Sequence, residues 1–170
     1  VTGTETVSLD AATMSSGGAV DIDGDTVTAT GSDVGASGSL ELAGASQITA
    51  DSATLTGAGS ATIDGGSISA VNVDLDADGT IAVTGDSTVM LDNAAVSNQY
   101  SGITISSAMD EIALDGANVS SSSPITIDGN SVSARTAEID GKNVQVLASG
   151  TLLADGSRVV SAGYGTVNLT

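Results

Sequence analysis

Two runs of alternating aspartates are the residues in this chain best suited to chemistry. Asp74, Asp76 and Asp78 occupy every second position, the spacing with which an EF-hand loop opens and directs carboxylates at a calcium ion. The twelfth position of that loop is Gly85 instead of the bidentate Glu, and strand-forming residues flank it. The run therefore predicts a looser calcium site at a corner of the chain. Acidic turn residues that face water are the alternative.

A second run, Asp21, Asp23 and Asp25, has the same spacing and predicts a second site of the same kind. The glycine-rich nonapeptide of the calcium-binding β-roll is absent from the sequence. Calcium is the one cofactor that the sequence suggests, and these six aspartates are its candidate ligands.

Catalysis has few candidate residues. The chain has no His and no Cys, so the usual nucleophilic triads are not available. Some enzymes on β-helical folds use Asp together with Lys or Arg to cleave acidic polysaccharides. Here Arg135 and Lys142 lie close in sequence to Glu138 and Asp140, and local ion pairing is the simpler interpretation. We predict no catalytic residue and no enzyme, with a polysaccharide-acting β-helix enzyme as a lesser alternative.

Two positions match the acceptor pattern for N-glycosylation. They are Asn118, followed by Val-Ser, and Asn168, followed by Leu-Thr. The pattern is short and often accidental, so each is a candidate modification site only.

The charge balance restricts the partners. The sequence has 21 acids against three bases, and all the bases lie between residues 135 and 158. We expect no nucleic-acid partner, because phosphate binding needs clustered Lys and Arg. An acidic surface of this kind keeps a protein soluble, attracts cations and suits a salty environment.

Three apolar columns with one shared period define the elements that must position these residues. The first column is Ile22, Leu42, Ile63, Val83, Ile105 and Ile127. The second is Val27, Ile48, Ile68, Val89, Ile112 and Val132, and the third is Val34, Leu55, Leu75, Val96, Val119 and Ile139. Spacings of 20 to 23 residues in three columns at once indicate a coil wound on itself.

Each coil alternates apolar and polar residues in the period of a half-buried strand, as in Val20-Asp21-Ile22. Two residues after the first-column residue comes a glycine in five of six coils, at Gly24, Gly44, Gly65, Gly85 and Gly129. We expect a corner there that needs an unusual backbone angle. Two coils are longer than the others, and we expect small corner loops at residues 97–102 and 120–124.

The columns extend to both ends of the chain, backwards to Val7 and Met14 and forwards to Val167 and Leu169. The predicted fold is therefore all-β, a single parallel β-solenoid domain over residues 1–170. It has about eight three-sided coils of 20–23 residues and no separate cap domain. Val7, Leu9, Val167 and Leu169 are the expected assembly ends, because an uncapped terminal strand can pair with another chain.

Hydroxyl side chains flank the second column in most coils, for example Thr26 and Thr28. This ladder is similar to the Thr-x-Thr faces of ice-binding proteins. Gln47, Met90 and Glu111 interrupt it, and β-propensity on a solvated sheet explains it more simply. Ice binding is a lesser alternative.

Two coils, Ser39–Gly44 and Gly79–Gly85, in a chain rich in Gly, Ser, Thr, Ala and Asp, resemble the passenger repeats of filamentous-haemagglutinin-like adhesins. The resemblance implies a right-handed parallel β-helix exported to the cell surface, where cell-surface or matrix glycans are partners. The scarcity of Lys departs from many members. The spike shafts of phage tails and type VI secretion machines carry similar strand repeats.

We therefore expect a non-enzymatic, extracellular structural protein. It is either a subunit that stacks head to tail into a filament or a segment of a surface adhesin. A trimeric spike or shaft segment is the alternative. The chain begins at Val1 instead of Met, which favours a processed segment located at the cell surface. No run of 18 apolar residues exists, so membrane insertion is not expected.

Overall fold

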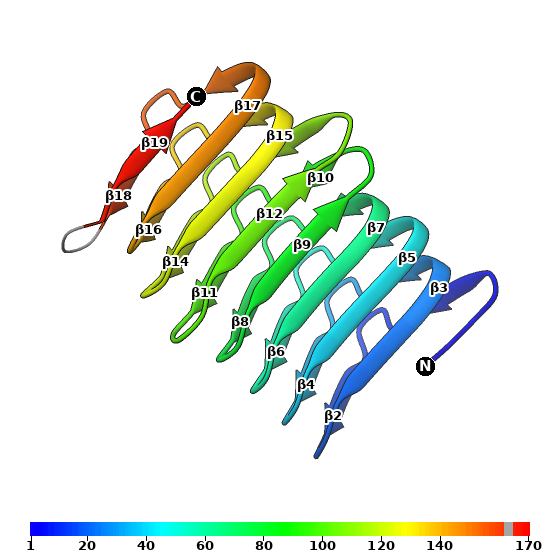
Figure 1. The fold of residues 1–170 in the computed structure, drawn as a ribbon. Coiled ribbons are helices and arrows are strands. Elements are labelled where there is room, and N and C mark those ends of the chain that lie inside the picture. Colours follow the sequence, from blue (N-terminus) through cyan, green and yellow to red (C-terminus); the bar gives the residue numbers. More distant parts are fainter. Residues whose placement is uncertain (162–164) are drawn as a thin grey trace.

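A computed structural model describes residues 1–161 and 165–170, which form strands, bends and turns and no helix. The strands stack into a rod, with the two ends of the chain at opposite ends of it (Figure 1). All strand pairs are parallel and fall into two sheets. The prediction of a parallel β-solenoid with about eight coils is confirmed.

The first sheet has eleven strands, most of them long or split in two. They are β1 (Thr6–Ser8), β3 (Val20–Thr28), β5 (Leu40–Thr49), β7 (Ala61–Ser69), β9 (Ile81–Gly85), β10 (Val89–Met90), β12 (Ile103–Ser107), β13 (Glu111–Ala113), β15 (Ile125–Ser133), β17 (Val144–Leu153) and β19 (Val167–Leu169).

The second sheet has eight short strands, one for each coil. They are β2 (Thr13–Ser16), β4 (Asp33–Ala36), β6 (Thr54–Gly57), β8 (Asp74–Ala77), β11 (Ala95–Asn98), β14 (Asn118–Ser121), β16 (Glu138–Gly141) and β18 (Arg158–Ser161). We number the coils 1 to 8 by these strands, so β1 and β2 form coil 1 and β17 and β18 form coil 8. β19 begins a ninth coil.

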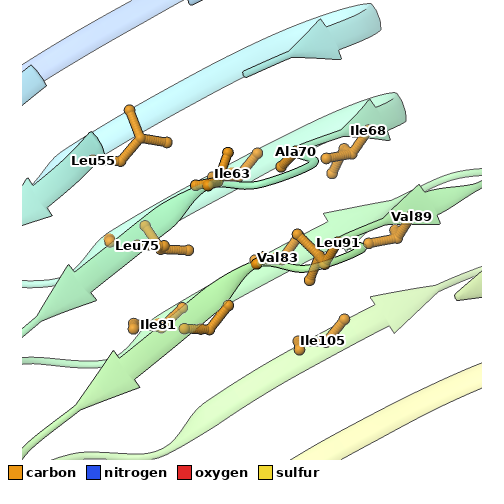
Figure 2. Packing of buried hydrophobic residues seen from close by; sticks show 14 of the residues in the cluster. Leu55, Ile63, Ile68, Ala70, Leu75, Ile81, Val83, Val89, Leu91 and Ile105 are labelled. Atoms are coloured by element: carbon orange, nitrogen blue, oxygen red, sulfur yellow. The ribbon is translucent and has the colours of Figure 1, made fainter. Parts of the chain in front are cut away.

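The strand register places each apolar column in line. Ile22 pairs with Leu42, which pairs with Ile63, and equivalent pairs stack the second and third columns. All the residues of the three predicted columns are at most 1% exposed. Figure 2 shows how some of these side chains, among them Leu55, Ile63 and Ile68, pack in the interior. Stacked aliphatic side chains of similar size fill the interior without aromatic residues, because each coil adds only a thin layer to the core.

The glycines that follow the first column do not adopt an unusual backbone angle, so that prediction is wrong. Among the glycines that the structure describes, only Gly31, Gly116 and Gly156 have positive φ. The reason for glycine is space: a Cβ at Gly44 would lie 2.6 Å from the Gln47 carbonyl oxygen and 2.7 Å from Ile48 Cγ1. The chain bends here, and the second-column side chain packs over the glycine.

We call this bend, between the first and second columns, the elbow. Its length varies, because the second column follows the first by five residues in coil 2 and by seven in coil 6. The expected loop at residues 120–124 is therefore misplaced: the extra residues of coil 6 lie at the elbow, around Met109, which is 65% exposed. The strand pairing of coil 6 is interrupted there, between β12 and β13.

We call the segment between the second and third columns the turn. Its length is constant, since the third column follows the second by seven residues in every coil. Each turn contains one residue with φ between 53° and 73°. In chain order these residues are Ala11, Gly31, Ser52, Asn72, Asn93, Gly116, Thr136 and Gly156.

Candidate functional site

The first predicted calcium run lies on the outer face of β8 and in the loop after it. Asp74 and Asp76 point outward on alternate positions, and Asp78 is exposed beyond the strand. Asp76 and Asp78 line one shallow groove of about 260 Å³ together with Thr56, but Asp74 does not line it. The Asp76 carboxylate accepts a hydrogen bond of 2.5 Å from Ser97 Oγ.

The second run, Asp21, Asp23 and Asp25, points outward from β3, and all three side chains are exposed. Asp25 accepts a 2.6 Å hydrogen bond from Ser46 Oγ in the next coil. Asp23 lines a different groove, at the elbow. The strand alternation that exposes all three residues also spreads their carboxylates along the strand.

Among residues 1–161 and 165–170, no group of three acidic side chains lies close enough together to hold a metal ion. Both calcium sites stay predictions, and the structure gives Asp76 and Asp78 as the pair that share a groove.

A groove of about 570 Å³ runs along the elbow of coils 5 to 8 and is open to solvent. The side chains of Asp86, Asp128 and Asn130 line it with several hydroxyls, and the exposed Met109 lies at its edge. No Lys or Arg is among its lining residues. The groove can exchange hydrogen bonds with a polar ligand.

The two glycosylation candidates are both accessible. Asn118 is the exposed first residue of β14, and Asn168 is exposed in β19. Modification at either position stays a prediction.

The expected local ion pairs of Arg135 are not formed. Its Nη1 lies 3.8 Å from Asp115 Oδ2 in the preceding coil. Arg158 likewise pairs with Glu138 one coil earlier. Parallel stacking explains this, because the nearest neighbours of a residue are those about 20 positions away in the adjacent coils and not those nearby in sequence.

An unpredicted feature is a set of aspartates at the turn that bind the next coil, which we call the aspartate ladder. Their carboxylates each accept a hydrogen bond from the backbone N–H at the equivalent turn position of the following coil. The bonds are Thr30 N–H to Asp10 (3.0 Å), Val71 N–H to Asp51 (3.0 Å), Asp115 N–H to Asp92 (3.0 Å) and Arg135 N–H to Asp115 (2.8 Å).

In two coils a serine hydroxyl also donates to the ladder. Ser69 Oγ lies 2.9 Å from Asp51 Oδ1, and Ser133 Oγ lies 2.7 Å from Asp115 Oδ1. At Asp10, the hydrogen bond from the Thr30 backbone N–H is the main cause that holds the pKa of the carboxyl below its ordinary value of 3.8.

Sequence reasoning could have found the ladder. An Asp stands directly before the positive-φ residue at positions 10, 51, 92, 115 and 155, and the first three are spaced by 41 residues, which is two coils. A carboxylate followed by a small residue at a fixed offset indicates a turn in which the side chain bonds to backbone.

The predicted assembly ends differ in how far the apolar columns are covered, and the C-terminal end is the more exposed. Val7 is buried and Leu9 is half-buried, whereas Val167 and Leu169 are 42% and 46% exposed. Among the described strands, β1 pairs only with β3, and β19 only with β17. One hydrogen-bonding edge of each therefore remains open to another strand.

Comparison with protein-family models, with curated proteins and with solved structures found no match. The described residues include no helix that is long and apolar enough to cross a membrane.

Proposed function

We propose that the chain is a non-enzymatic structural rod of the cell exterior that stacks end to end into a filament. The observation that supports this proposal is the state of the columns at the two ends. The apolar columns that are fully buried in coils 2 to 7 are only half-buried at Met14 at one end, and are 42% and 46% exposed at Val167 and Leu169 at the other. Another coil placed on them would bury this surface and satisfy the open backbone groups.

The way in which the coils are joined also suits a rod that acts as a spacer. Its coils are joined by parallel strand pairing on both sides of the elbow, for example β5 to β7 with eight paired positions. Each coil contacts only its neighbours, so length can be added without any change to the cross-section.

A surface adhesin segment is the second form of the proposal, and the elbow groove favours it. Hydroxyl, amide and carboxylate groups around Asn130 and Asp128 are the groups that hydrogen-bond to the hydroxyls of a glycan. Binding of neutral glycans to the rod, measured on a glycan array and lost on Asn130→Ala with Asp128→Ala, would support the adhesin form.

The filament form is tested by the mass of the purified chain in solution. Light scattering over a range of salt and calcium concentrations should show masses that grow with protein concentration, and electron micrographs should show rods of one width and variable length. A strictly monomeric chain under all these conditions would exclude the filament. A closed trimer would favour a spike or shaft segment instead. Labelling of intact cells with an antibody tests the location.

A further inference from the structure

We propose that the seam between two stacked copies has a defined register, in which coil 1 of one copy lies on coil 8 of the other. In this register β1 pairs with residues 151–153 of β17, and β2 pairs with β18. The Asp155 carboxylate of one copy accepts hydrogen bonds from Asp10 N–H and Ser8 Oγ of the other. This inference rests on the proposed function, because it assigns the contacts of the same end surfaces.

The covered and uncovered parts of coil 8 point to this register. β19 lies on the first half of β17, where Val167 pairs with Val144 and Leu169 with Val146. Among the described strands, none pairs with the outer edge of the second half of β17 or with that of β18. These two edges are the strand positions that β1 and β2 occupy in coil 1.

The spacing of the columns lets both strands fit at once. Leu152 and Val159 are seven residues apart, and so are Val7 and Met14. The second and third columns are seven residues apart in every coil. Placing Val7 over Leu152 therefore also places Met14 over Val159. Val7 is already buried, whereas Leu152, Val159 and Met14 are half-buried and would gain cover.

The aspartate ladder supplies the polar half of the seam. Each ladder carboxylate faces the coil that follows it, and Asp155 is the ladder position of coil 8. No hydrogen bond reaches the Asp155 carboxylate from the part of the chain that the structure describes. In coils 4 and 7 the receiving coil offers a serine two positions before its bonded N–H, at Ser69 and Ser133. Coil 1 has the same sequence spacing with Ser8 and Asp10; Ser8 Oγ there donates to Asp10 Oδ2 (3.1 Å) and would turn to Asp155 in the seam.

Charge favours contact between unlike ends over contact between like ends. The three bases of the chain are at positions 135, 142 and 158, in coils 7 and 8, whereas coil 1 carries Glu5 and Asp10 and no base. Two N-terminal ends would place acids against acids, which disfavours a head-to-head dimer.

One segment must move for the seam to close. Residues 1–3 hydrogen-bond along β3 through Asp23, and Thr170 bonds to the equivalent edge of β17 through Ala148 and Val146. In the joined rod, residues 1–3 of one copy and the C-terminal residues of the other would occupy the same position. Deletion of residues 1–3 should therefore strengthen end-to-end association, and a weaker association on deletion would contradict this register.

Disulfide trapping tests the register directly, because the chain has no cysteine of its own. Thr6 and Thr151 are exposed and become directly paired neighbours in the proposed seam. Paired strands are about 4.8 Å apart, which is within the Cα separation that a disulfide tolerates. Oxidation of the Thr6→Cys/Thr151→Cys double variant should give a ladder of covalent multimers on a non-reducing gel. The matched control is Thr13→Cys/Thr151→Cys, whose cysteines lie on different sheets, and it should give none.

The outcomes separate the two proposals. The seam is supported if the wild type forms filaments and only the Thr6→Cys/Thr151→Cys variant gives covalent multimers. If the wild type forms filaments but this variant gives no covalent multimers, or the control gives them too, the register is wrong and the filament proposal is unaffected. A wild-type chain that stays monomeric overturns both.

The role of the carboxylate has its own test. Asp155→Ala removes an exposed side chain and should leave the melting temperature of the rod unchanged, but it should lower the end-to-end association constant by about tenfold, the effect of losing hydrogen bonds to a charged group. The control is Asp110→Ala, an exposed aspartate at an elbow, which should leave association unchanged. Equal association constants for wild type and Asp155→Ala would overturn the assignment.

Discussion

The elbow and the turn restrict the sequence in opposite ways. At the elbow the residue type is fixed and the length varies: glycine follows the first column in five of six coils, while the distance to the second column ranges from five to seven residues. At the turn the length is fixed at seven residues, while the positive-φ position holds Ala, Gly, Ser, Asn or Thr.

The difference follows from what each corner contacts. The elbow glycine lies against a second-column side chain of its own or of the preceding coil, and a Cβ at Gly85 would lie 2.6 Å from Val89 Cγ2. Extra elbow residues can bulge into solvent, as at Met109. The turn is held on both sides by hydrogen bonds to the turns of neighbouring coils, for example Asn72 N–H to the Asp92 carbonyl oxygen, 3.0 Å. A residue added there breaks the match with both neighbours.

Insertions should separate the two corners most strongly. One glycine inserted after Val71 lengthens a turn to eight residues and directs Leu75 outward or forces a bulge, because a shift by one residue reverses the faces of a strand. We expect the free energy of unfolding to fall by at least about 2–5 kcal/mol, the cost of removing one buried leucine side chain. Urea unfolding followed by circular dichroism measures it.

The matched insertion is one glycine after Gly66, which lengthens the elbow of the same coil from five to the six residues found in coil 3. It should shift the unfolding midpoint far less than the turn insertion. Equal losses at both corners would show that the elbow has no greater tolerance of length.

Substitution of an elbow glycine should have the next largest effect on the stability of the rod. Gly44→Ala places a Cβ within 2.7 Å of backbone and of Ile48, so the strand has to shift. We expect overpacking to lower the free energy of unfolding by about 1–3 kcal/mol. Gly17→Ala is the control, since nothing lies within 4 Å of its Cβ position. Thermal unfolding of both variants should show a lower melting temperature for Gly44→Ala alone.

Removal of one ladder carboxylate should have a similar or somewhat smaller effect. Asp115→Ala leaves the Arg135 N–H and the Ser133 hydroxyl without their acceptor. We expect the free energy of unfolding to fall by about 1.5–3 kcal/mol, the range for hydrogen bonds to a charged group. Asp115→Asn keeps an acceptor oxygen and should recover part of the loss in urea unfolding. A loss as large for Asn as for Ala would argue against this role of the acceptor.

At the turn, strain at the positive-φ position should be removable. Thr136 is β-branched and has φ of 53°, a conformation that asparagine adopts more readily, as Asn72 and Asn93 do in coils 4 and 5. Thr136→Asn should stabilise the rod by about 1 kcal/mol. Thr126→Asn, at an outward strand position, is the control and should not stabilise. Differential scanning calorimetry of the two variants distinguishes them.

The architecture was predictable because burial imposes a strict period. Ile22, Leu42 and Ile63 repeat at nearly constant spacing since each must meet its equivalent in the next coil. The role of the elbow glycines was not predictable in the same way. Glycine tolerates both positive φ and close approach, so the residue type alone did not tell which of the two applied at Gly44.

The contacts of polar residues were predictable only after the coil pairing was known. Arg135 is near Glu138 in sequence, yet it pairs with Asp115, one coil away. The ladder aspartates escaped notice for the same reason, because Asp10 and its donor Thr30 are 20 residues apart. A pattern search at the period of the coil, instead of among near neighbours, would find such pairs.

Acid should weaken the turn of coil 1, and this is the smallest effect that we expect. The pKa of Asp10 is below its ordinary value of 3.8 in the folded chain, mainly because of the Thr30 N–H. The ionised carboxylate therefore stabilises the fold above the unfolded pKa, and this contribution is lost as the pH falls through the lower, folded pKa. Asp10→Asn should flatten the fall in melting temperature between about pH 5 and pH 2. Asp25→Asn, for an exposed aspartate at an elbow, is the control, and an equal flattening by both would contradict a specific role of the turn.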